Sequence, residues 1–172
     1  MKQPAAGLFA APISTVLFDV GNTLHHLDHA FIAGAVTRHS HPVAPREVAV
    51  AEYAAKAGVD AMFRSRAAGT DAARRFSYFG TILETLHVHA AAVEPIIEEL
   101  HADAARASLW RVMDPDTPRV IEELRRRGFT LGVVSNADGR VAGSLAARGI
   151  VEQFATIVDS HLVGVEKPAA RI

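Results

Sequence analysis

A carboxylate, a hydroxyl and a lysine occur at three separate points of the sequence, in an order that one nucleophilic site could use. Asp19 lies in the segment FDVGNTL, Ser135 in VSNAD and Lys167 in VGVEKP. A carboxylate can attack an electrophile, and a hydroxyl with nearby backbone amides can hold an anion. A lysine can neutralise the charge between the two. These residue types therefore predict covalent catalysis on an anionic substrate.

The segments that precede these residues are predicted to be strands that bring them together. The strands are Ile13–Val20, Phe129–Val134 and Ala155–Val158, which are rich in β-branched and apolar residues. Helical sequence separates them, so right-handed crossovers and a parallel sheet are expected, with ligands at the carboxyl ends of the strands. The nearly continuous apolar character of the first strand predicts that it is buried on both faces. Asp138 is expected to cap the helix that follows Ser135.

A long stretch after the first strand has a different texture. Alanine is frequent there, β-branched residues are sparse, and the stretch is too long for a loop. Helices are predicted over Ala30–Ala33, Val48–Met62, Phe76–Leu86 and Val93–Leu109. The sequence therefore predicts an α/β core formed by residues 13–24 and 112–172, with an inserted helical subdomain at 25–111.

In this order, the three segments resemble motifs one to three of the haloacid dehalogenase superfamily. The helical insertion resembles that family's helical cap, and the resemblance covers the chain from Ile13 onward. Any one motif is common, whereas the ordered set is specific. The resemblance implies a Rossmann-like hydrolase core with an α-helical cap.

The resemblance also implies roles for individual residues. Asp19 would be the nucleophile that forms a covalent aspartyl intermediate, and Lys167 would bridge it to the transferred group. Thr23 would support the turn after the nucleophile. Ser135 and the backbone amide of Asn136 would bind the phosphoryl oxygens of a small organophosphate substrate.

The implied cofactor is Mg²⁺, bound by Asp19 and by the backbone carbonyl of Gly21. A metal is needed because a carboxylate that attacks a phosphate brings two anions together. Gly21 stands where phosphatases of this family usually carry a second Asp as general acid and base. Loss of such a group costs on the order of 10²–10⁴ in rate. A metal-independent 2-haloacid dehalogenase, in which Asp19 displaces halide, therefore stays open as an alternative.

The family's fourth motif, an acidic loop that lies beyond Lys167, has no counterpart here. No Asp or Glu follows Glu166 in the sequence. The core is therefore expected to be incomplete, with strand Ile13–Val20 at an edge of the sheet. Exposed edges invite pairing, so a homodimer through this strand is expected. An inactive remnant or fragment that acts as an interaction module is the alternative of another class.

Composition excludes several partners and sites. The net charge is −1 and the pI is near 6.8, which does not suit binding to nucleic acid. The chain has no cysteine, so thiol chemistry is excluded and a cytoplasmic location is expected. No apolar run is long enough to span a bilayer. The short apolar stretch 5–11 resembles a weak secretory signal, and that interpretation is not favoured.

Two further clusters invite functional interpretations. His25 and His29 would share one face of a helix, as metal-binding pairs do, although a polar hinge is the favoured interpretation. His87 and His89 lie in a segment whose surroundings look helical. The basic residues of the insertion could contact an anionic substrate but more simply form a solvated helix face. They are Arg64, Arg66, Arg74 and Arg75.

Overall fold

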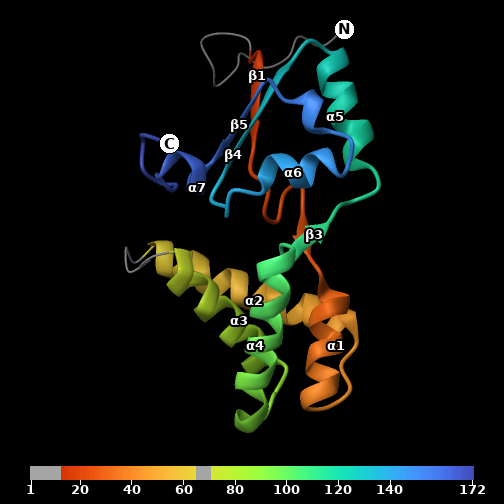
Figure 1. Ribbon diagram of the computed structural model, residues 1–172, viewed down its shortest axis with the longest axis vertical. Helices are drawn as coiled ribbons and strands as arrows, with labels where there is room; N and C mark the ends of the chain where they lie inside the picture. The colour runs from red at the N-terminus through yellow and green to blue at the C-terminus, as the bar shows by residue number, and fades with distance from the viewer. Residues whose placement is uncertain (1–12, 65–70) are drawn as a thin grey trace, which may run out of the picture. The chain divides into compact units, whose positions relative to one another are not determined.

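The computed structural model describes residues 13–64 and 71–172, which form two compact units (Figure 1). One unit, Met1–His26 with Val112–Ile172, is called the α/β unit below, and the other, Leu27–Arg111, is called the helical unit. The apolar stretch 5–11 and the basic cluster of Arg64, Arg66, Arg74 and Arg75 lie outside the residues whose side chains the structure describes.

A parallel sheet forms the centre of the α/β unit. Its strands are β1 (Thr15–Phe18), β4 (Thr130–Ser135) and β5 (Thr156–Asp159), in the order β1-β4-β5. Phe18 pairs with Val133, and Ser135 pairs with Asp159. The α/β fold with parallel strands predicted from the sequence is confirmed.

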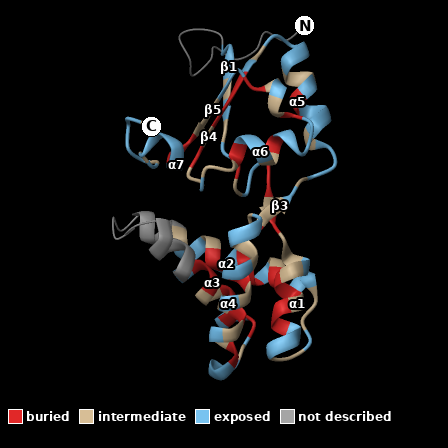
Figure 2. Ribbon diagram, in the orientation of Figure 1, coloured by how far each residue is buried: buried red, intermediate tan, exposed pale blue. Residues whose placement is uncertain are grey.

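Short helices and one apolar cluster complete this unit. The helices are α5 (Thr117–Arg126), α6 (Val141–Ala146), the 3₁₀ turn η1 (Val151–Gln153) and α7 (Ser160–Val163). The largest side chains that are fully buried in the cluster come from α5, β4 and α6, and Figure 2 shows β4 as buried along most of its length. They are Ile121, Leu131, Val133 and Leu145. Each such side chain contributes about 1.5–3 kcal/mol through its burial.

Strand β1 lies at the edge of the sheet and is buried on one face only. Val16 and Phe18 pack against the apolar cluster, whereas Thr15 and Leu17 are exposed. Leu17 lies over Gly132. A Cβ atom at position 132 would come within 2.8 Å of Cδ2 of Leu17, so a side chain there would clash with Leu17. The predicted two-sided burial was therefore wrong, because an apolar run does not reveal which faces of a strand receive a packing partner.

The helix after Ser135 begins later than predicted and is capped differently. Helix α6 starts at Val141, with Arg140 at its N-cap, and Asp138 instead pairs with Arg140. The backbone amides of Gly139 and Val141 donate to the carboxylate of Asp159 from strand β5. The capping prediction for Asp138 was wrong, because a carboxylate from a neighbouring strand already takes these amides.

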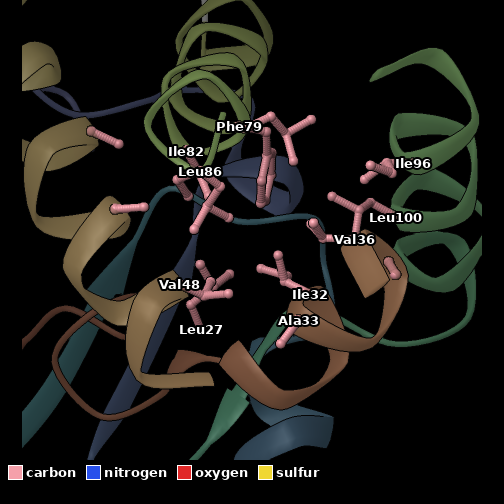
Figure 3. Packing of buried hydrophobic residues seen from close by; sticks show 14 of the residues in the cluster. Leu27, Ile32, Ala33, Val36, Val48, Phe79, Ile82, Leu86, Ile96 and Leu100 are labelled. Carbon is pink, nitrogen blue, oxygen red and sulfur yellow. The ribbon is translucent and has the colours of Figure 1, made fainter. Parts of the chain in front are cut away.

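The helical unit has its own core. Its helices are α1 (His29–His39), α2 (Pro45–Arg64), α3 (Asp71–Thr85) and α4 (Ala90–Arg106). The short strands β2 (His26–Leu27) and β3 (Trp110–Val112) pair with each other where the chain passes from one unit to the other. Apolar side chains from the four helices converge, as Figure 3 shows for Ile32 on α1, Val48 on α2, Ile82 on α3 and Ile96 on α4. None of the helices in the described part of the chain combines the length and apolar character needed to cross a bilayer.

The last two helices of the insertion depart from the predicted bounds. Helix α4 spans Ala90–Arg106, so Leu109 lies beyond it. His87, with a φ of 55°, and His89, the N-cap of α4, lie in the connection from α3 to α4. Helices α3 and α4 flank these two histidines, as the sequence suggested, and the chain turns between them because helix α3 ends at Thr85.

Candidate functional site

Asp19 follows strand β1 and is presented by a tight turn. The carbonyl of Val20 accepts backbone hydrogen bonds from Thr23, Leu24 and His25, which folds the chain back directly after the strand. The Val20 amide donates to Asp19 Oδ1 at 2.7 Å. The side chain of Asp19 stays 45% exposed. The turn fixes the Asp19 carboxylate through the Val20 amide, and its exposure to solvent leaves it accessible to a substrate.

Lys167 reaches Asp19 from a distant part of the sequence. Its Nζ lies 3.0 Å from Asp19 Oδ1 and donates to the carbonyl of Val134 at 3.0 Å. Both contacts to the Asp19 carboxylate, from Lys167 and from the Val20 amide, use Oδ1, and Oδ2 takes part in neither. The ammonium can therefore neutralise charge at Asp19 while the second oxygen stays available.

Two other predicted site residues, Ser135 and Thr23, lie at the end of β4 and in the turn after β1. Ser135 is the last residue of β4 and is buried. Thr23 is exposed in the turn after Asp19, and its amide donates to Val20. In the described part of the chain, no hydrogen bond joins Ser135 or Thr23 to Asp19 or Lys167. The structure thus brings together Asp19 and Lys167 and leaves the anion-binding roles as predictions.

The side chain of Asn136 makes a contact that the sequence did not suggest. Its Oδ1 accepts the Lys167 amide at 2.7 Å, and its Nδ2 donates to the Lys167 carbonyl at 3.1 Å. The resemblance had pointed to the backbone amide of Asn136 as an anion donor. The carboxamide instead contacts the backbone of the lysine that reaches the nucleophile.

Asp159 and Ser160 hold the loop after Ser135, and sequence reasoning missed both. Asp159 is only 2% exposed and accepts from the amides of Gly139, Val141 and His161. The Ala137 amide donates to the Ser160 hydroxyl at 3.0 Å. The one available signal was an Asp that directly follows a strand and precedes a short helix, which is a capping pattern.

The histidines of the first loop and of helix α1 have separate surroundings. His25 is 2% exposed, and the structure gives its Nε2 no hydrogen-bond partner among the described residues. Burial, aided by the charge of Arg148, lowers the pKa of His25, so its neutral form is favoured. The Nε2 atom of His29 lies 2.6 Å from Glu52 and is thereby engaged within the helical unit.

The donors near Asp19 suit Mg²⁺ only in part. Over residues 13–64 and 71–172, no group of three or more His, Asp or Glu side chains could hold a metal ion. The chain offers the Asp19 carboxylate and backbone carbonyl oxygens of the turn. Mg²⁺ commonly binds through one or two carboxylates, water and substrate phosphate. These residues therefore fit an ion shared with substrate, and not an ion held by protein alone.

Comparisons with known proteins agree with this arrangement. The chain is 35% identical over 99 residues to human haloacid dehalogenase-like hydrolase domain-containing protein 3. The alignment covers 55% of this chain and 39% of that protein. The aligned part thus spans about two fifths of that relative's length. The structure resembles a hydrolase from Streptococcus pneumoniae, with 17% identity, a TM-score of 0.59 and coverage of 90% of this chain and 70% of that one.

A second solved structure extends the likeness. It is the putative HAD-hydrolase YfnB from Bacillus subtilis bound to magnesium, with 19% identity and a TM-score of 0.59, over 92% of this chain and 68% of that one. Structures described as a dehalogenase and as a putative phosphatase also share the fold, with TM-scores of 0.54 and 0.52. At these identities the structures establish the fold and leave the reaction open.

A family model provides the broadest match. It describes haloacid dehalogenase-like hydrolases and covers residues 13–172, which include both units and all three candidate motifs. Together with the parallel sheet and the contact between Asp19 and Lys167, this match shows that the chain belongs to the family of haloacid dehalogenase-like hydrolases.

Proposed function

We propose that this hydrolase cleaves a small phosphate ester through a covalent intermediate on Asp19. The observation that carries the proposal is the 3.0 Å contact between Asp19 Oδ1, directly after strand β1, and Lys167 Nζ, in the segment after helix α7. A lysine in this place lowers the repulsion between a carboxylate and an approaching phosphate, since it interacts with both anions. Residues 13–24 and 112–172 would be the hydrolase core, and residues 25–111 the cap that selects the substrate.

In the first step, an Asp19 carboxylate oxygen attacks phosphorus. A bond from oxygen to phosphorus forms, the ester P–O bond breaks, and an alcohol leaves after it takes a proton from water. Lys167 stays against Asp19 Oδ1, so Oδ2 is the oxygen placed to attack. Ser135 and the backbone amide of Asn136 would donate hydrogen bonds to the phosphoryl oxygens.

In the second step, water attacks phosphorus of the acyl phosphate. Inorganic phosphate leaves, and the carboxylate of Asp19 is regenerated. Gly21 cannot take part in either proton transfer, because it has no side chain. The expected phosphatase is therefore slow compared with one that carries a carboxylate at that position.

We include Mg²⁺ in the proposal, held by Asp19 and the carbonyl of Gly21. When bound, the ion supplies charge neutralisation for the phosphoryl oxygens. The small number of protein donors suits an ion that binds together with substrate.

The test measures inorganic phosphate released from a panel of small phosphate esters, with Mg²⁺ and with a chelator. Asp19→Asn keeps the shape of the side chain and removes the nucleophile. Asp116→Asn is the matched control in the same unit, at an exposed carboxylate that pairs with Arg119. We expect Asp19→Asn to abolish the release and the control to retain it. Release that persists in Asp19→Asn would contradict the proposal.

A second candidate reaction is the hydrolysis of a 2-haloacid without a metal. The absence of a side chain at Gly21 favours it, because displacement of halide by Asp19 needs no proton on the leaving group. The carbon–halogen bond breaks, an ester to Asp19 forms, and water then hydrolyses that ester. Halide released from 2-haloacids in the presence of a chelator, and lost in Asp19→Asn, would identify this reaction. If neither phosphate nor halide is released, the inactive interaction module becomes the leading proposal.

A further inference from the structure

The segment that bears Lys167 has little regular structure to hold it. Strand β5 ends at Asp159 and helix α7 ends at Val163, where Gly164 adopts a φ of 71°. The residues from Val165 to the end of the chain form turns that are mostly exposed. A lysine on such a segment needs a further constraint to keep its ammonium against one oxygen of Asp19.

The carboxamide of Asn136 provides that constraint. It accepts from the Lys167 amide at 2.7 Å and donates to the Lys167 carbonyl at 3.1 Å, so both polar backbone groups of one residue are paired. A carboxamide side chain carries an acceptor and a donor next to each other, so it can pair with a backbone N–H and C=O as the backbone of a neighbouring strand does. An ionised carboxylate offers acceptors only.

Asn136 is itself fixed by its neighbours in the chain. It directly follows Ser135, which pairs with Asp159 in the sheet, and it precedes Ala137, whose amide donates to the Ser160 hydroxyl. The carbonyl of Val134, two residues before Asn136, accepts from Lys167 Nζ at 3.0 Å. One short stretch at the end of β4 therefore holds both the backbone and the ammonium of Lys167.

We infer that Asn136 is a positioning residue that sets the register of Lys167, and so places its ammonium against Asp19. Its carboxamide acts through the lysine, whereas only its backbone amide would meet the substrate. The inference concerns the same site as the proposed phosphatase, but the contacts that carry it do not depend on which ester, or which haloacid, is hydrolysed.

The primary test observes Lys167 directly and needs no turnover. The chain has three lysines, Lys2, Lys56 and Lys167, so protein labelled with ¹³C at lysine Cε gives three signals. Lys56→Arg assigns one of them, and Lys56, paired with Glu52 in the helical unit, then serves as the internal reference. We expect Asn136→Ala and the isosteric Asn136→Asp to move the Lys167 signal towards that of a solvated lysine, with Lys56 unchanged.

A matched control separates this effect from general loosening of the loop. Asp138→Ala removes another side chain of the same loop, one that pairs with Arg140. It should leave the Lys167 signal in place. A Lys167 signal that stays unchanged in both Asn136 variants, or that shifts equally in Asp138→Ala, would overturn the inference. So would loss of the fold in both variants, since the carboxamide would then support the unit as a whole.

A kinetic arm applies once a substrate is known. Misplacing a catalytic group by about 1 Å can cost roughly 100-fold in rate, so we expect kcat to fall by about that factor in Asn136→Asp, with KM little changed. A rise in KM at constant kcat would instead place Asn136 against the substrate and overturn the positioning role. If the unsubstituted chain hydrolyses nothing, the proposed function fails while the lysine spectrum still decides this inference.

Discussion

Position 21 determines whether the site has a general acid, because Gly21 has no side chain that could transfer a proton. Asp19 and Lys167 supply a nucleophile and a positive charge, 3.0 Å apart. Gly21, two residues after the nucleophile, is where phosphatases of the family carry an acid. The backbone at Gly21 does not have a positive φ, so a side chain is conformationally allowed there.

Gly21→Asp is therefore expected to raise phosphate release rather than to damage the site. A positioned general acid contributes about 10²–10⁴ in rate, and we expect a gain towards that range if the chain is a phosphatase. Gly21→Asn is the control, since it has the same shape and transfers no proton. Measured kcat values for one ester in the three proteins check this. An equal effect of both substitutions would argue against a missing acid.

Helices α1, α2 and α3 are joined by a buried acid as well as by apolar packing. Glu52 is only 4% exposed and accepts from Tyr78 at 2.6 Å, from His29 at 2.6 Å and from Lys56 at 3.0 Å. Burial by itself would raise the pKa of Glu52, but the hydrogen bonds from Tyr78, His29 and Lys56 outweigh it and leave the pKa below its usual value. The charged form of Glu52 is thus the form that stabilises the helical unit.

This lowered pKa predicts acid sensitivity of the helical unit. A carboxyl whose pKa is lower in the folded state contributes stability above its unfolded pKa of about 4.5 and loses it as the pH falls through the folded value. Glu52→Gln should cost about 2–3 kcal/mol at pH 7, and the difference from the unsubstituted chain should shrink below pH 4.5. Fluorescence of Trp110, the single tryptophan and a residue of the helical unit, reports this unfolding.

The exposed Glu98 on helix α4 provides the control for that measurement. Glu98→Gln should leave the unfolding curve unchanged at every pH, since the side chain is on the surface. A gap between Glu52→Gln and the unsubstituted chain that stays constant from pH 7 to pH 3 would show that the charge of Glu52 is not what stabilises the unit.

At the scale of the whole molecule, the outer edge of strand β1 is a candidate surface for pairing with another chain. Among the described residues this strand pairs only with β4, and Leu17 on it is 61% exposed. An edge strand with apolar side chains is a template for pairing with another chain. We propose that two copies of the chain associate through this edge, although a partner of another kind could use the same strand.

Leu17→Lys is expected to weaken that association. A lysine on an edge strand opposes strand pairing, so the concentration at which dimers form should rise at least tenfold in sedimentation velocity experiments. Leu162→Lys, at another exposed leucine of the α/β unit, should have no effect. A monomer at all concentrations of the unsubstituted chain would exclude the dimer.

Local patterns in the sequence determined much of this protein. Runs of β-branched and apolar residues predicted strands at the places where β1, β4 and β5 form, and helical spacing predicted helices within the insertion. Order along the chain then sufficed to predict a parallel sheet with Asp19, Ser135 and Lys167 near its carboxyl ends. These features depend on residues close in sequence and on the handedness of crossovers. They can therefore be predicted without knowing which distant residues come into contact.

Tertiary structure alone decided the contacts between side chains and distant backbone. That β1 is buried on one face, that Asp159 takes the amides before α6, and that the carboxamide of Asn136 pairs with the backbone of Lys167 all depend on which segments become neighbours. The types of these residues are compatible with many local roles, such as caps and turns. Only the folded chain selects one of these roles, because a hydrogen-bond partner distant in sequence is fixed by the packing of the strands.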